Sequence, residues 1–219
     1  MSMRFLALIL ALAAPVFGQT KSLAQGPHRL EITLEREQGG DWKTVDPGLV
    51  FDQDDRVRFR VRGNFNGFLY VTNQTTSGVS RLLFPSEDAG KQNRMEIGRE
   101  YLLPATEGWF RITGPPGHEI IYWLISPVEL KSEGGGPAPY VPLPPPPKSK
   151  QAPANLTPRC DDTIMRARGD CVDTSAGPKP GRDLRSRDLT FVRRQNSSVV
   201  AAPAALAGPV VFEFRLAHR

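Results

Sequence analysis

The sequence predicts an all-β protein whose main body is an immunoglobulin-like antiparallel β-sandwich. In several short segments apolar residues recur at every second position, which is the period of a half-buried strand. Turn-forming residues interrupt these segments about every ten positions, and no segment has a convincing helical period. The stretch 19–130 is close in length to an immunoglobulin-like domain of about 100 residues, so it is long enough to bury one core.

The predicted strands follow one another along this stretch. In segment 28–37 apolar residues alternate with polar ones, and in segment 56–63 three apolar residues face one way and four arginines the other. Asn66-Gly67 comes next and is a strong short signal for a hairpin turn. The remaining predicted strands are segments 67–73, 79–85, 99–104, 109–114 and 118–126.

Residues 1–18 have the layout of a secretory signal peptide. A positive charge at Arg4 precedes the apolar run 5–14, and small residues precede Gln19. The run is shorter than the roughly 20 residues that span a bilayer, and no other stretch is long and apolar enough. We therefore expect export to the periplasm or the cell exterior after cleavage near Gly18, with no transmembrane segment in the mature chain. A second cleavage point is conceivable after Ala24.

Segment 131–150 is rich in glycine and proline and is expected to be a linker. Glycines 134–136 form a hinge, and the prolines after them form a stiff polyproline II spacer. The alternative is a recognition motif for an aromatic groove.

The charge composition changes across this linker. Stretch 19–130 has 13 basic and 15 acidic residues, whereas the residues after 130 have 14 basic and 8 acidic ones. We therefore expect 151–219 to be a basic C-terminal extension. Near its end Phe212, Phe214 and Leu216 alternate with charged residues, which predicts a terminal strand. This strand is expected to dock on an exposed edge of its own sandwich or of a partner.

Cys160 and Cys171 are the only cysteines, and they lie in a short polar loop. In an oxidising compartment such a pair most economically forms a disulfide. The three histidines are scattered, so a zinc site with these cysteines is not expected. Asp161 and Asp162 are placed to cap a short helix that would run to Arg168.

Arginines form the one unusual charge pattern. Four alternate along segment 56–63 and so share one face, while others cluster between 182 and 194. The first set is interpreted either as solvated arginines paired with nearby acids or as the lining of a groove for an anion. The second is a solvated connector or a contact for anionic envelope polymers or lipid head groups. The candidate anion-binding residues are Arg56, Arg58, Arg60, Arg62, Arg182, Arg185, Arg187, Arg193 and Arg194.

The sequence contains no pattern that specifies catalysis, a metal site or a cofactor. His118 beside Glu119 is interpreted as a surface residue at the start of a strand. The acidic turn 52–55 does not have the spacing of a calcium loop. No glycine-rich segment leads from a strand into a helix, so a phosphate-binding loop is not expected.

The central segment resembles a family of bacterial domains of unknown function, family 4384. The resemblance extends from Leu49 to about Val128 and rests on the motifs DDRVRFRV, NGFLYVTN, LLFP, EYLLP and TGPPGHEIIYWLIS. Phe68 stands where a tyrosine is common, and the turn 52–55 replaces a simpler one. The family is similar to envelope and secreted modules, so the resemblance implies an exported β-domain. It adds no catalytic residue, and it leaves the tail unassigned.

These observations predict a non-catalytic binding or scaffolding module of the bacterial cell envelope. Its expected partner is an envelope protein or an anionic surface polymer, and nucleic acid is not expected because the protein is predicted to be exported. The alternatives are an accessory or regulatory subunit of a secreted enzyme and, less favoured, a cryptic hydrolase.

Overall fold

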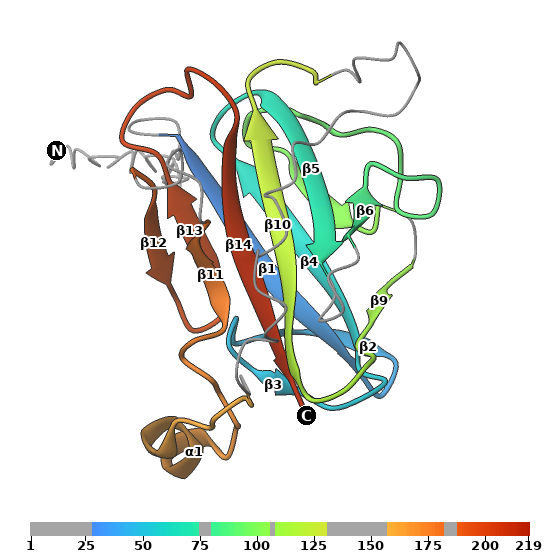
Figure 1. Ribbon diagram of the computed structural model, residues 1–219, viewed down its shortest axis with the longest axis vertical. Coiled ribbons are helices and arrows are strands. Elements are labelled where there is room, and N and C mark those ends of the chain that lie inside the picture. Colours follow the sequence, from blue (N-terminus) through green and yellow to red (C-terminus); the bar gives the residue numbers. More distant parts are fainter. Residues whose placement is uncertain (1–27, 75–79, 106–107, 131–156, 182–187) are drawn as a thin grey trace, which may run out of the picture.

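The computed structural model is a β-sandwich with one short helix (Figure 1). It describes residues 28–74, 80–105, 108–130, 157–181 and 188–219. The predicted signal peptide and the predicted linker, at 131–150, lie outside these described residues. Among the described residues, no helix is long and apolar enough to cross a membrane.

The first sheet is built around the two most regular predicted strands. Its strands run in the order β12-β13-β1-β4-β8, with β2 beside β1 and β9 beside β4. Antiparallel pairing of β1 with β4 places Ile32 opposite Val61 and Leu34 opposite Phe59 on the core face. The strand bounds are β1 Arg29–Gln38, β2 Asp41–Val45, β4 Arg56–Gly63, β8 Glu100–Leu103, β9 Phe110–Arg111, β12 Thr190–Arg193 and β13 Ser198–Ala201.

The second sheet has the order β11-β14-β10-β5-β6, with β3 beside β14 and β7 beside β5. Its two longest strands, β10 and β14, pair antiparallel along almost their whole length. Both strands are buried on both faces, which explains why their apolar residues are not confined to one alternation. The strand bounds are β3 Val50–Phe51, β5 Gly67–Gln74, β6 Ser80–Phe84, β7 Arg94–Met95, β10 Gly117–Ser126, β11 Gly177–Pro180 and β14 Val210–His218.

Aromatic side chains from both sheets meet at the centre of the core. The ring of Phe59 from β4 lies 5.2 Å from that of Trp123 on β10, edge to face. It lies 5.4 Å from the ring of Phe214 on β14, and Phe212 stacks on Trp123 at 6.2 Å. All four side chains are fully buried. The C-terminal strand therefore supplies half of the central aromatic cluster.

The C-terminal strands belong to the same two sheets. The sequence predicted a basic extension after residue 130 whose terminal strand docks on an edge of its own sandwich or of a partner. β14 pairs with β10 of its own sandwich, β11 pairs with the other side of β14, and β13 and β12 extend the first sheet beyond β1 (Figure 1). The physical reason is that β10 would otherwise expose a long unpaired edge, and the first four residues of β1 a shorter one. The sandwich is one unit made from both sides of the segment 131–156.

The expected hairpin at Asn66-Gly67 is also wrong. β4 belongs to the first sheet and β5 to the second, so the chain crosses the core between them. Phe65 is buried at this crossing, and Asn66 uses its side-chain oxygen to accept a hydrogen bond from the backbone of Ile97. A Cβ at Gly67 would lie only 2.8 Å from the carbonyl oxygen of Ser126, so close backbone approach is what this glycine provides.

The predicted disulfide and helix are both present. Cys160 and Cys171 are bonded, and helix α1, Asp162–Arg168, lies between them. Asp161 is the N-cap and accepts hydrogen bonds from the backbone of Thr163 and Ile164. The helix buries none of its residues, so the bridge and the caps hold it rather than packing.

Candidate functional site

The four arginines of β4 lie on the outer face of the first sheet, as alternation predicts. Carboxylates from neighbouring strands face each of them. Glu35, whose side chain is only 4 % exposed, accepts hydrogen bonds from Arg58 at 2.6 Å and from Arg60 at 2.7 Å. The other pairs are Arg56 with Glu37 at 3.1 Å, Arg60 with Glu100 at 3.0 Å and Arg62 with Glu31 at 3.2 Å.

Two tryptophans complete this charged face. The guanidinium of Arg58 lies 4.3 Å from the ring centre of Trp42, and that of Arg56 lies 4.5 Å from that of Trp109. Burial opposes the charge of Arg60, but Glu35 and Glu100 outweigh it and raise the pKa of this guanidinium. The arginines are thus neutralised in place, which favours the paired interpretation over an anion groove.

Of the described C-terminal candidates, Arg194 is linked to this row, because it shares Glu31 with Arg62, whereas Arg193 pairs elsewhere. Arg193 pairs with Asp46, which is largely buried, and Arg194 lies 3.8 Å from Glu31. The remaining candidates, Arg182, Arg185 and Arg187, lie outside the described residues.

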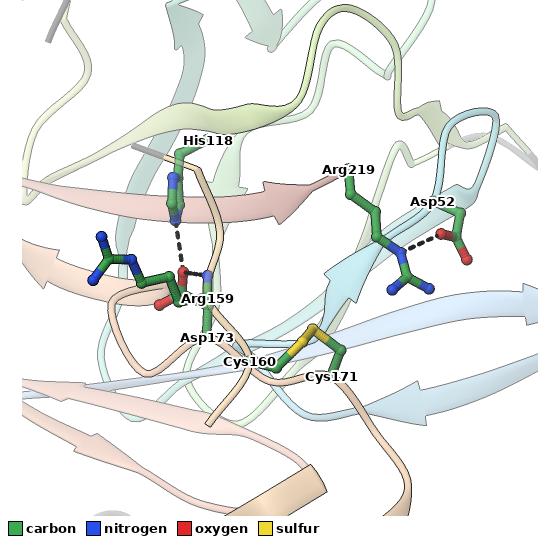
Figure 2. Close-up of a disulfide and its surroundings, with 7 residues drawn as sticks. All are labelled: Asp52, His118, Arg159, Cys160, Cys171, Asp173 and Arg219. Atoms are coloured by element: carbon green, nitrogen blue, oxygen red, sulfur yellow. Dashed lines mark hydrogen bonds and ion pairs between the residues drawn. A yellow bond between two sulfur atoms is a disulfide. The ribbon is translucent and has the colours of Figure 1, made fainter. Parts of the chain in front are cut away.

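A polar cluster that the sequence did not reveal lies beside the disulfide (Figure 2). His118, at the start of β10, has its Nε2 atom 3.5 Å from Asp173 Oδ2 and 3.4 Å from the hydroxyl oxygen of Ser175. Asp173 accepts hydrogen bonds from the backbone of Arg159 and from the hydroxyl of Ser175. Burial would raise the pKa of Asp173, but these hydrogen bonds and His118 together lower it.

The three side chains do not have the geometry of a catalytic triad. In a triad the serine and the carboxylate address opposite nitrogens of the imidazole. Here both lie nearest the same nitrogen, and Ser175 donates its hydroxyl hydrogen to Asp173 at 2.6 Å instead of to the histidine. This arrangement supports a structural role, in which the cluster holds the loop after the disulfide against the start of β10.

The structure also contains a groove of about 650 Å³. One wall is β6, which is the last strand of its sheet, and the other is β9 with Trp109 before it. Buried side chains of Ile112, Ile121 and Leu216 contribute to its lining. Positively and negatively charged residues also line the groove, namely Arg81, Asp88, Arg111 and Glu119.

Two strand edges border this groove. Among the described residues β6 pairs only with β5, and β9 pairs only with β4. Figure 1 shows β6 and β9 on the same side of the sandwich. An extended chain entering the groove would meet strand edges that have no second neighbour in the described part of the chain, as well as apolar side chains.

The acidic turn is fully engaged by arginines. Asp52 pairs with Arg219 at 2.8 Å, as Figure 2 shows, and Asp54 lies 3.4 Å from Arg111. Asp55 pairs with Arg36 at 2.9 Å. In the described part of the chain, no group of His, Cys, Asp and Glu side chains is placed to hold a metal ion.

The family suggested by the sequence is confirmed by comparison with known families. Residues 50–129 match the family described as Domain of unknown function (DUF4384). The matched region begins at β3 and ends just after β10, so it includes every lining residue of the groove except Leu216, and it contains neither β1 nor the C-terminal strands. No curated protein and no solved structure matches the chain.

Proposed function

We propose that the protein is a non-catalytic, exported binding module of the bacterial envelope that holds an extended segment of a partner protein. The groove between β6 and β9 carries this proposal. It combines two strand edges with apolar side chains, which is how proteins bind an extended peptide by strand addition.

The charge distribution supports a protein partner over an anionic polymer. Every described arginine among the nine candidates has a carboxylate within 4.0 Å. These carboxylates offset the positive charge that would otherwise attract an anion. The groove carries both signs of charge, which suits a peptide backbone with mixed side chains.

Two tryptophans provide a matched pair of variants for the test. Trp109 and Trp42 each lie against an arginine of β4, but only Trp109 lines the groove. Full-length Trp109→Ser and Trp42→Ser would be compared with the wild type for capture of envelope proteins at low and high salt. A photo-crosslinking residue at position 82, in β6, would identify what occupies the groove, with position 42 as its control.

The proposal expects salt-resistant capture that Trp109→Ser weakens at least tenfold and Trp42→Ser leaves unchanged. Crosslinks should form from position 82 and not from position 42. Capture that disappears at high salt and is indifferent to Trp109→Ser would refute the groove and point to an anionic polymer.

A further inference from the structure

The outer face of the second sheet carries a cluster of apolar and aromatic side chains. It is defined by Phe68 and Tyr70 on β5, by Ile120, Tyr122 and Leu124 on β10, and by Val211 on β14, which we call the aromatic face. Among the described residues no strand or helix covers it (Figure 1). Yet Tyr70 is 0 % exposed, Leu124 1 % and Val211 5 %.

The chain turns onto this face as it leaves β10. The side chain of Ser126 accepts a hydrogen bond from the backbone of Val128, forming a tight turn. Leu130 then packs against the aromatic face and donates its backbone N–H to the hydroxyl of Tyr70 at 2.8 Å. The last described residue before the gap therefore already lies on the aromatic face, close to the end of β10.

The chain returns near the other end of the same strand. Thr157 and Arg159 line a cavity together with His118, the second residue of β10. The backbone N–H of Arg159 is bonded to Asp173, which contacts His118 (Figure 2). Segment 131–156 thus begins at one end of β10 and ends at the other.

We propose that the proline-rich stretch from Pro137 to Pro147 docks on the aromatic face as a polyproline II helix. At about 3.1 Å per residue this stretch would be about 34 Å long. β10 has ten residues, and at about 3.4 Å per residue it has the same length of about 34 Å. The length of this stretch therefore matches that of the strand whose two ends flank the gap.

The chemistry of the two surfaces matches as well. Aromatic rings, and tyrosines in particular, line the grooves that bind polyproline II helices. With three residues per turn, Tyr140, Leu143 and Pro146 lie along one edge of such a helix and can contact the face together. Thr72 is buried between the rows of this face, and its hydroxyl has no hydrogen-bond partner among the described residues. A polyproline II helix has free carbonyl oxygens that can accept from it.

This inference is independent of the groove between β6 and β9. It assigns the sandwich a second binding surface that recognises proline-rich peptides and is occupied by the chain itself. Because tethering gives an effective concentration in the millimolar range, a free peptide at micromolar concentration should not displace it.

The test replaces residues 137–147 with a Gly/Ser sequence of equal length in the full chain. A synthetic peptide with the sequence of residues 135–149 should bind this variant with a dissociation constant below about 1 mM and should not bind the wild type. Tyrosine-selective labelling of Tyr70 and Tyr122 should increase at least threefold in the variant. As a matched control, Ser replaces Lys148 and Lys150, which lie outside the proline run, and labelling should not change.

A second pair of variants tests whether the peptide binds at the aromatic face. In the Gly/Ser background, Tyr122→Ser should abolish binding, whereas Leu102→Ser, an exposed position on β8 in the other sheet, should not. If the Gly/Ser chain folds but neither binds the peptide nor gains tyrosine labelling, the proposal is overturned. Binding that survives Tyr122→Ser would equally contradict it.

Discussion

Glu35 is the central side chain of the charged face, and its substitution gives the first prediction. Its carboxylate is nearly buried and holds both Arg58 and Arg60. Glu35→Ala leaves two guanidiniums without their shared partner and should lower the free energy of unfolding by about 3 kcal/mol, as for other broken buried pairs. Urea denaturation of the two proteins measures this difference.

An exposed pair provides the control for that prediction. Glu96 and Arg99 lie 3.3 Å apart, and both side chains are more than half exposed. Glu96→Ala should change the free energy of unfolding by less than about 1 kcal/mol, because solvent screens such pairs. Equal losses in Glu35→Ala and Glu96→Ala would show that burial of Glu35 does not matter.

His218 gives a prediction about pH. Its imidazole is almost fully buried near the end of β14, and burial lowers its pKa. Glu119 at 4.0 Å opposes this shift, and His118 adds to it. The unfolded chain therefore binds the proton more tightly, so stability should fall as the pH drops below the ordinary histidine pKa of about 6.5.

The measurement is the midpoint of urea unfolding between pH 7.5 and pH 5 for the wild type and His218→Gln. The glutamine variant should show a shallower loss of stability across this range, since it has no proton to gain at this position.

Asp173 affects stability in a different pH range. Its pKa is lowered, so its contribution is lost only below about pH 4. Parallel curves for the two proteins would rule out His218 as the group responsible.

At the scale of elements, the disulfide loop gives the third prediction. Helix α1 buries no residue, whereas Val172 directly after the bridge is fully buried. Cys160→Ser with Cys171→Ser should therefore unfold α1 and leave the sandwich strands intact, with a loss of about 3 kcal/mol or less. Hydrogen exchange should show lost protection at residues 162–168 alone. Retained protection there would mean that the caps suffice without the bridge.

The elements that the sequence predicted are those with a local signal. Strict alternation identified β1 and β4, and the pair Asp161 and Asp162 identified the start of α1. Two short strands were missed, because β3 and β7 have two residues each and therefore show no periodicity. β11 was missed because its sequence, GPKP, carries two prolines, which are tolerated at the edge of a sheet.

The site was less predictable because it depends on contacts between distant residues. Alternation placed the four arginines of β4 on one face, but not the glutamates of β1 opposite them. His118 meets Asp173 only because the disulfide loop folds against β10. No sequence signal joins these residues, and the groove between β6 and β9 likewise brings together residues that are distant in the sequence.

At the scale of the whole molecule, the order of the strands in the two sheets decides whether the N-terminal part can fold alone. The N-terminal part up to Leu130 contains β10 and β1, whose missing neighbours β14 and β13 come from beyond the gap. A chain ending at Leu130 would expose both edges and lose Phe212 and Phe214 from the core. Truncation there is therefore a test of folding and not of what the tail binds.

The last prediction is that the sandwich can assemble from two fragments that are not covalently linked through segment 131–156. The fragment 19–130 alone should be unfolded or aggregated, and so should the fragment 157–219. Mixed together, the two fragments should assemble into one folded sandwich, because β10 pairs with β14 over nine registered positions and β1 with β13 over four. Burial of Trp123 against Phe212 gives a fluorescence signal for assembly.

A matched control uses the same fragments with Phe212→Ser and Phe214→Ser, which keep the strand but remove its core side chains. This pair should not assemble, or should do so at least a hundredfold more weakly, since each buried phenylalanine is worth about 2 kcal/mol or more. A fragment 19–130 that folds cooperatively alone would show instead that the sandwich closes without its C-terminal strands. The segment 131–156 would then join two independent parts, as the composition of the sequence first suggested.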